Sequence, residues 1–294
     1  MTTATLDANA QALQTISQRE RMWRTFTQNK AAVVGLILVI IVALIALFAP
    51  VLAPHDPLRQ DTFNRLAPPS SDYPLGQDDY GRDILSRTIY AARISLMVGI
   101  LSVLAGGTIG TVIGIFAGYR GGATETFLMR VVDVLLAFPD LITGLLVLAV
   151  LGGGLFKMII AIAIVISPRF ARIAHGPTLA LRERDHVLAA RSIGVKEGRM
   201  LFRHILPNML GELLVMASLW TASAIRIEAN LSFIGLGVSP PTPTWGQMIR
   251  DGTVHLTTTP WFSIVPGIAV FVTVLAFNLL GDGLRDVLDP KLQN

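Results

Sequence analysis

Acidic side chains within apolar stretches are the residues of this chain whose types and spacing could do chemistry. Asp133 and Asp140 are seven residues apart, so they lie on roughly one face of a helix. A carboxylate inside a membrane is energetically expensive, which makes each a candidate functional residue. Two interpretations are open: a proton relay, or a structural ion pair between Asp133 and Arg130, one turn earlier. Asp140 has no basic residue within a turn, so we predict that it is unpaired and faces water.

The remaining residue types exclude most forms of catalysis. The chain has no cysteine, which excludes disulfides, thiolate metal sites and cysteine nucleophiles. No Gly-Lys-Ser/Thr stretch is present to cradle phosphate, so the chain cannot hydrolyse ATP alone. The histidines lack metal-ligand spacing; they are His55, His175, His186, His204 and His255. We therefore predict a protein that is not an enzyme and that holds no metal or cofactor.

Composition indicates the class of protein that positions these acids. Apolar residues make up 52% of the 294 residues and charged residues only 15%, against roughly 45–50% and about 25% in soluble domains. The mean hydropathy is +0.59. The net charge of +4 comes from basic residues beside apolar segments, which is a membrane pattern rather than a nucleic-acid one. We predict an integral membrane protein made only of α-helices.

Six membrane spans fit the apolar stretches best, which predicts a six-span helical bundle. They cover residues 31–54, about 94–119, about 128–151, about 155–174, about 208–230 and about 262–281. The third span contains Pro139, which should kink it because proline removes a backbone donor. The fifth is the least apolar, since it contains Glu212, Arg226 and Glu228.

Charge asymmetry orients the spans. The N-terminal tail and the interruption Arg169–Arg203 are basic, whereas the loop 55–90 is net acidic. Basic segments stay in the cytoplasm. We therefore expect both termini and the interruption to be cytoplasmic.

Two further features predict local packing. Glycines repeat every fourth residue along the second span, at Gly106, Gly110, Gly114 and Gly118. They form a stripe that lets helices approach closely, an interpretation that we favour over pore lining. The stretch Leu231–Trp245 is rich in glycine and proline yet keeps apolar side chains, which indicates a compact cap on the outer face rather than an exposed linker.

The basic interruption contains Leu188-Ala-Ala-x-x-x-Gly194, and Leu206-Pro207 follow twelve residues after the glycine. This run resembles the "EAA" loop of ABC-importer permeases, with Leu188 in place of the usual acid. In that family the loop forms short helices that fit a cleft on the ATPase subunit. The resemblance implies an ATPase contact through Leu188, Ala189, Ala190, Gly194, Leu206 and Pro207.

Other stretches resemble the peptide/nickel branch of these permeases, the C-type subunit of dipeptide and oligopeptide systems. Tyr73-Pro-Leu-Gly-Gln-Asp-Asp-Tyr-Gly-Arg-Asp-Ile-Leu-Ser-Arg87 is similar to the family's "PLGTDxxGRDxLSR" segment. The runs Ala229–Gly246 and Asn278–Pro290 resemble its outer loop and its C-terminal end, in the family's order.

The resemblance implies a permease subunit of an ATP-driven importer of short peptides in the bacterial inner membrane. Implied partners are a homologous permease subunit, two ATPase subunits that bind the ATP, an extracytoplasmic binding protein and membrane lipid. The chain would divide into a cytoplasmic tail 1–30, the first span 31–54, an extracytoplasmic loop 55–90, a five-span core 91–281 with a coupling loop 175–207, and a cytoplasmic tail 282–294.

Candidate residues for the translocation path are Asp140, Arg226 and Glu228. Arg226 and Glu228 could touch a peptide's termini, or they could simply mark the membrane interface. A rival function is a gradient-driven secondary transporter with Asp133, Asp140 or Glu228 as the coupling site. Within the ABC interpretation, nickel chelates, glutathione and oligosaccharides are alternative cargo.

Overall fold

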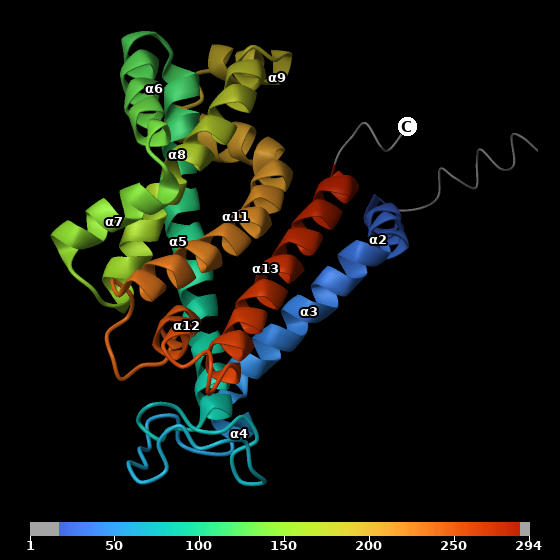
Figure 1. Ribbon diagram of the computed structural model, residues 1–294. Coiled ribbons are helices and arrows are strands. Elements are labelled where there is room, and N and C mark those ends of the chain that lie inside the picture. The colour runs from blue at the N-terminus through green and yellow to red at the C-terminus, as the bar shows by residue number, and fades with distance from the viewer. Residues whose placement is uncertain (1–17, 289–294) are drawn as a thin grey trace, which may run out of the picture.

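The computed structural model describes residues 18–288, which form a helical bundle without a strand (Figure 1). Residues 1–17 and 289–294 of the two expected tails lie outside the described residues. The prediction of an all-α fold is confirmed. The helices are α2 (Gln18–Gln28), α3 (Lys30–Leu47), α4 (Ala49–Leu52), α5 (Ile84–Arg120), α6 (Gly122–Ala137), α7 (Asp140–Leu151), α8 (Leu155–Arg182), α9 (Asp185–Ser192), α10 (Glu197–Met200), the π-helical turn η1 (Leu201–Ile205), α11 (Leu206–Ile234), α12 (Trp245–Thr253) and α13 (Trp261–Leu288).

Four helical stretches within residues 18–288 are long and apolar enough to cross a membrane. They are α3, α5, the continuous stretch Glu197–Ile234 and α13. The pair α6 and α7 makes a fifth if it counts as one span, although the two helices meet at 98°. The kink predicted at Pro139 is therefore a complete break. The predicted fourth span lies within α8, and the total of six spans is not confirmed.

The glycine stripe packs α5 directly against α8. A side chain at Gly106, Gly110 or Gly114 would collide with main-chain atoms of Ala163, Ser167 and Ala171 respectively, and one at Gly118 would meet His175 and Thr178. Ser102 continues the series, because its hydroxyl donates to the Ile159 oxygen at 3.2 Å. The positions advance by four residues on both helices. The prediction that the stripe serves close helix packing is confirmed.

This register also fixes the direction of the chain. Residue numbers rise together along α5 and α8, so the two helices are parallel. The chain must therefore return along the bundle between them, and α6 and α7 are the elements that carry it back (Figure 1).

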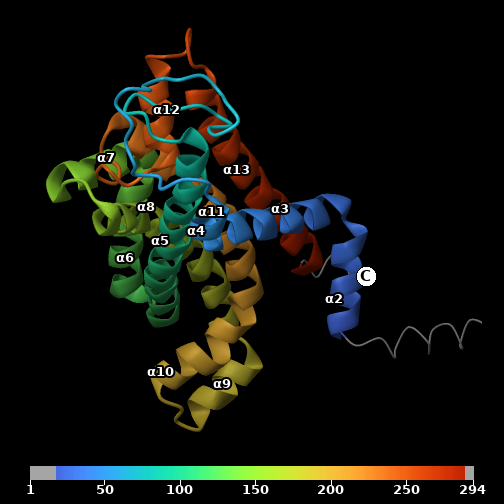
Figure 2. The same cartoon turned by 90° about the horizontal axis from the view of Figure 1, so that it is seen from below.

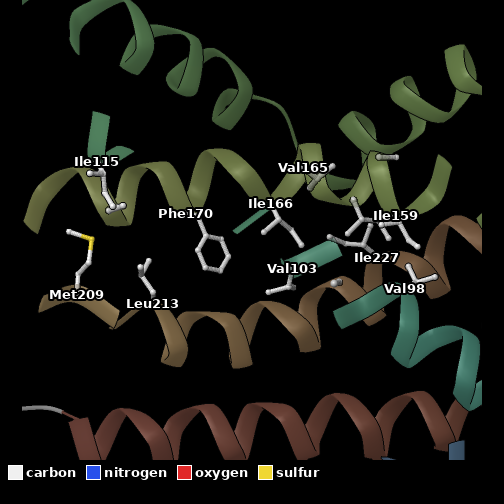
Figure 3. Packing of buried hydrophobic residues seen from close by; sticks show 14 of the residues in the cluster. Val98, Val103, Ile115, Ile159, Val165, Ile166, Phe170, Met209, Leu213 and Ile227 are labelled. Carbon is white, nitrogen blue, oxygen red and sulfur yellow. The ribbon is translucent and has the colours of Figure 1, made fainter. Parts of the chain in front are cut away.

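A hydrophobic core holds α5, α8 and α11 together. Figure 3 shows Phe170 and Ile166 of α8 facing Leu213 of α11 and Val103 of α5. The helices α3 and α13 lie side by side along one flank (Figures 1 and 2). Their contact also uses small residues, since a side chain at Gly283 would collide with Ala32.

The long connection between α4 and α5 folds around a buried carboxylate. Asp78 is fully buried and accepts hydrogen bonds from Arg82 Nε at 2.7 Å and from the main-chain N–H of Tyr80 at 2.9 Å. Arg87, which is 1% exposed, approaches the same carboxylate at 3.3 Å. The loop is therefore ordered by a desolvated ion cluster.

The stretch Leu231–Trp245 is compact, as predicted. Helix α11 extends to Ile234 and ends at Gly235, whose φ is 100°. Thr244 then caps α12, and the indole of Trp245 is buried against the start of α5.

Candidate functional site

A segment of residues 183–205 projects from one end of the bundle; we call it the projecting segment (Figure 2). It comprises α9, a turn at Gly194, α10 and the π-helical turn. Val187 is 1% exposed and Ala190 is 7% exposed, so these two residues hold α9 on the core. Leu188, by contrast, is 41% exposed.

The residues expected to contact an ATPase differ in their exposure to solvent. Leu188, Ala189, Gly194 and Pro207 are exposed, whereas Leu206 is half-buried. Ala190 is buried on the core side of α9, because its position one residue after Ala189 turns it toward the core.

Two exposed apolar residues were missed by sequence reasoning. Ile193 is 82% exposed and Phe202 is 61% exposed, and both lie in the projecting segment beside basic residues. The signal available in the sequence for Ile193 was an apolar residue four positions after Ala189, on the same helix face.

Gly194 makes the turn that separates α9 from α10. Its φ is 79°, in the left-handed region, and its N–H donates to the Arg191 oxygen at 3.0 Å. No other atom lies within 4 Å of a side chain built there, so only the backbone conformation demands glycine.

The projecting segment is tied to the bundle by a salt bridge. Arg120 Nη2 at the end of α5 lies 3.0 Å from Glu197 Oε2 at the start of α10. Arg182 adds a second tie at the base of the segment, because its Nη1 donates to the Gly118 oxygen at 2.9 Å.

A second feature is a row of paired acidic and basic side chains between the α6–α7 pair and α8, two ion pairs and one carboxylate–imidazole contact, which we call the ion-pair strip. Each acidic residue of α6 and α7 pairs with a basic residue of α8. The pairs are Asp140–Arg169 at 2.6 Å, Asp133–Arg172, and Glu125–His175 at 2.8 Å.

The strip corrects two predictions. Asp133 pairs with Arg172 on another helix and not with Arg130 on its own, and Asp140 is paired rather than alone. Both errors have one cause: a search within one turn of the same helix cannot find a partner that packing brings from 29 or more residues away. The separation is 29 residues for Arg169 and Asp140.

Arg169 joins three helices. Besides its ion pair with Asp140 of α7, its guanidinium lies over the ring of Trp220 of α11, 4.6 Å from the ring centroid. A cation over an aromatic face is attracted by the ring quadrupole, so the side chain has a second support that does not depend on Asp140.

Arg226 and Glu228 do not form a shared site. Glu228 is fully buried and accepts hydrogen bonds from Ser95 at 2.9 Å and from Ser232 at 2.7 Å. Arg226 is exposed. Residues two positions apart on a helix point in directions that differ by about 200°, which explains why Arg226 and Glu228 face opposite sides. Glu228 is therefore closed to a substrate in this conformation.

A polar pocket of about 300 Å³ lies in the connection between α4 and α5. His55, Asp56, Tyr73 and Asp83 are among its lining residues. The His55 ring stacks on Tyr73 with ring centroids 4.5 Å apart.

The pKa of Asp79, in the same connection, is raised above its usual range by burial and, second, by the neighbouring Asp78 carboxylate. Within residues 18–288 no group of three or more His, Asp or Glu could hold a metal ion.

Comparisons with known proteins show which family this chain resembles in sequence and in fold. Residues 110–294 match the family described as binding-protein-dependent transport system inner membrane component, and residues 17–69 match the N-terminal TM domain of oligopeptide transport permease C. A solved structure titled as an inward-facing MetNI methionine ABC transporter aligns with a TM-score of 0.56 and 17% identity, over 70% of this chain and 98% of that one. At this identity it supports the fold alone.

Curated relatives match almost from end to end. The dipeptide transport system permease protein DppC of Alkalihalophilus pseudofirmus is 40% identical over 95% of this chain and 92% of its own. The glutathione transport system permease protein GsiD of Pectobacterium atrosepticum is 43% identical over 92% and 91%. The oligopeptide transport system permease protein OppC of Bacillus subtilis is 42% identical over 97% and 95%. The chain belongs to the family of binding-protein-dependent transport system inner membrane components and is a C-type ABC-transporter permease.

Proposed function

We propose that this chain is the permease subunit of an ATP-driven importer that carries short peptides into the bacterial cytoplasm. The observation that carries the proposal is the sequence identity of at least 40%, over more than nine-tenths of the chain, to permeases named for dipeptides, oligopeptides and glutathione. Glutathione is itself a tripeptide, so the three named cargoes share one chemistry.

The permease works with partners. Those we expect are a homologous permease subunit, two ATPase subunits, an extracytoplasmic binding protein and the surrounding lipid. The projecting segment supports the ATPase contact, because Leu188, Ile193 and Phe202 expose apolar surface on short helices at one end of the bundle. The chain itself has no phosphate-cradling loop, so ATP is bound and hydrolysed by the partners.

The orientation that fits this scheme places the projecting segment and both termini in the cytoplasm. The segment is basic, as cytoplasmic loops are. The connection between α4 and α5 and the helix α12 then lie outside, where the binding protein delivers its cargo.

Movement reaches the bundle through contacts made by both short helices of the projecting segment. Val187 and Ala190 fasten α9 to the core, and Glu197 fastens α10 to Arg120. A displacement of α9 by closing ATPases would therefore act on α5 and α8, which are locked together along the glycine stripe. The bundle would open alternately to each side of the membrane.

The rival function, a gradient-driven secondary transporter, is less well supported by the candidate acids. Asp133 and Asp140 are each paired with arginine, and Glu228 is enclosed by two hydroxyl donors. Nickel chelates and oligosaccharides remain alternative cargo.

The test is reconstitution of the complex. The tagged chain is purified from its native membrane with its co-purifying subunits and placed in proteoliposomes with the binding protein. We expect uptake of labelled dialanine that requires ATP. Uptake that persists without ATPase subunits and follows an imposed proton gradient would contradict the proposal.

A further inference from the structure

We propose that two pairs of the ion-pair strip, Asp133–Arg172 and Asp140–Arg169, line the water-filled path and bind the charged groups of a passing peptide by exchanging partners. The inference rests on the proposed function for the identity of the cargo. It adds Asp133, two arginines and a mode of binding to the candidate path, which already included Asp140.

The depth of the two pairs follows from the packing of α8 on α5. Phe170 and Ala171 lie between the two arginines and contact Gly110 and Gly114 of α5. Both glycines belong to Ile94–Tyr119, the stretch of α5 without a charged residue. The Asp140–Arg169 pair is therefore level with the inner part of this stretch, and the Asp133–Arg172 pair lies about one turn nearer to its end at Tyr119.

The pairs are only partly covered at this depth. The exposed fractions of the side chains are 49% for Arg172, 45% for Asp133, 34% for Arg169 and 26% for Asp140. Charged groups do not face lipid hydrocarbon, because nothing there replaces their hydration. The strip must face water or protein in the assembled complex. A permanent protein interface would take four charges out of water, which is unfavourable unless each is fully hydrogen-bonded. A water-filled path leaves their outer sides hydrated.

The chemistry of the strip suits a peptide. A free peptide carries an ammonium group and a carboxylate, and its side chains add further charges. An arginine guanidinium binds a carboxylate through two parallel hydrogen bonds, and an aspartate accepts hydrogen bonds from an ammonium group. Exchange of one ion pair for another leaves no charge unpaired, so the peptide is held weakly and passes on.

Asp140 can leave Arg169 for a substrate group without displacing the arginine. Arg169 keeps its place over Trp220 when Asp140 turns to the substrate, and its Nε is buried with no hydrogen-bond partner in the described residues. Arg169 and Arg172 are three residues apart on α8, a rise of about 4.5 Å. Both guanidinium groups can therefore be reached from one position in the path.

The third pair of the strip, Glu125–His175, is the control for the other two. Glu125 and His175 lie near Gly118 and Gly121, toward the end of α5, and His175 is only 13% exposed. We assign this pair to the attachment of α6 on α8 and not to the path.

The first experiment measures access of water and needs no substrate. Single cysteines are placed at Asp133 and Asp140 of the cysteine-free chain in the assembled complex, with Val134→Cys and Leu146→Cys as controls. The control side chains are 59% and 65% exposed but apolar, so we expect them to face lipid. A polar, membrane-impermeant methanethiosulfonate should react at least about tenfold faster at 133 and 140 than at the controls. Equal rates at all four positions would overturn the proposal.

The second experiment measures charge selectivity in reconstituted complexes. The variants Arg172→Gln and Asp133→Asn leave opposite unpaired charges on the strip. We compare ATP-driven import of Ala-Lys-Ala with that of Ala-Glu-Ala, and the ratio of the two rates cancels differences in assembly. The ratio should rise in Arg172→Gln and fall in Asp133→Asn, each by about three- to tenfold. In Glu125→Gln it should equal that of the wild type.

The outcomes separate the two proposals. A ratio that stays the same in both strip variants, or that moves in one direction in both, would show that the pairs are only structural. A wild-type complex that imports neither peptide nor trialanine, but whose strip cysteines react quickly, would refute peptides as the cargo and leave the water-filled path intact.

Discussion

The indole Nε1 of Trp245 donates a hydrogen bond of 3.0 Å to the main-chain oxygen of Thr88, which joins the start of α12 to the first turns of α5. The indole is 2% exposed, so the bond is made away from water. The compact cap that follows α11 is thus fastened to α5 by this contact and by the buried ring, and Ser263 of α13 adds a hydrogen bond of 3.0 Å to the Ile249 oxygen of α12.

Trp245→Phe tests this attachment. The Thr88 oxygen lies in a helix and keeps its helical donor, so the loss should be about 1 kcal/mol of stability, whereas Trp245→Ala should lose about 3–5 kcal/mol because it also leaves a cavity. Thermal unfolding of the detergent-purified complex measures both. Trp23→Phe is the control, since Trp23 is 63% exposed. An unchanged midpoint for Trp245→Ala would contradict the role of the ring.

Gly194 should be replaceable by asparagine but not by valine. Its left-handed φ costs an ordinary L-residue roughly 1–2 kcal/mol, and a β-branched one more, whereas asparagine tolerates it. We expect Gly194→Val to insert normally but to lose co-purifying ATPases, and Gly194→Asn to retain them. Gly198→Ala serves as the control, because Gly198 also has open space around it. Normal coupling in Gly194→Val would show that the turn is not part of the ATPase contact.

The same substitution at two glycines should have opposite effects. Gly114→Ala places a methyl group against the main chain of Ala171, and overpacking of this kind costs about 1–3 kcal/mol. Gly176→Ala on α8 meets nothing within 4 Å and should stabilise its helix by up to about 1 kcal/mol. The yield of assembled complex and its unfolding midpoint give the comparison. Equal behaviour of the two variants would disprove the tight α5–α8 contact.

Glu228 should tolerate replacement by glutamine. An amide can accept a hydrogen bond from one of the two serine hydroxyls and donate to the other, so we expect ATP-driven import within about twofold of the wild type. Glu228→Leu, which leaves Ser95 and Ser232 without their acceptor, should lower stability by about 1–3 kcal/mol. Complete loss of transport in an intact Glu228→Gln complex would instead favour a proton-coupling role.

Reporter fusions test the orientation. Positions near 60 and 240 should report from outside the cytoplasm, and positions near 10, 185 and 290 from inside. Because α5 and α8 run parallel, the chain must cross the membrane an odd number of times between the end of α5 and the start of α8. A cytoplasmic signal at 240 would overturn this topology.

Local patterns in the sequence were sufficient for features that depend on one helix. The spacing of Gly106 to Gly118 predicted a close helix contact, and Pro139 predicted a kink in the third span, where the structure has a complete break. Partners across helices were not predictable in this way. Asp140 was expected to be alone, although Arg169 lies beside it, because the partner depends on how α7 packs on α8. The burial of Ala190 and Glu228 was missed for the same reason.

The matched steps along α5 and α8 have a consequence for how the bundle can flex. Both helices repeat their contact every four residues, so one helix could slide past the other only by a whole step of about 6 Å. Smaller shifts would drive side chains into the opposing main chain, so the pair should behave as one stiff lever. Outside this pair, we expect bending where one helix gives way to another, at Phe138–Pro139 between α6 and α7 and in the π-helical turn Leu201–Ile205. A change in the angle at either place would turn the α5–α8 pair as one body.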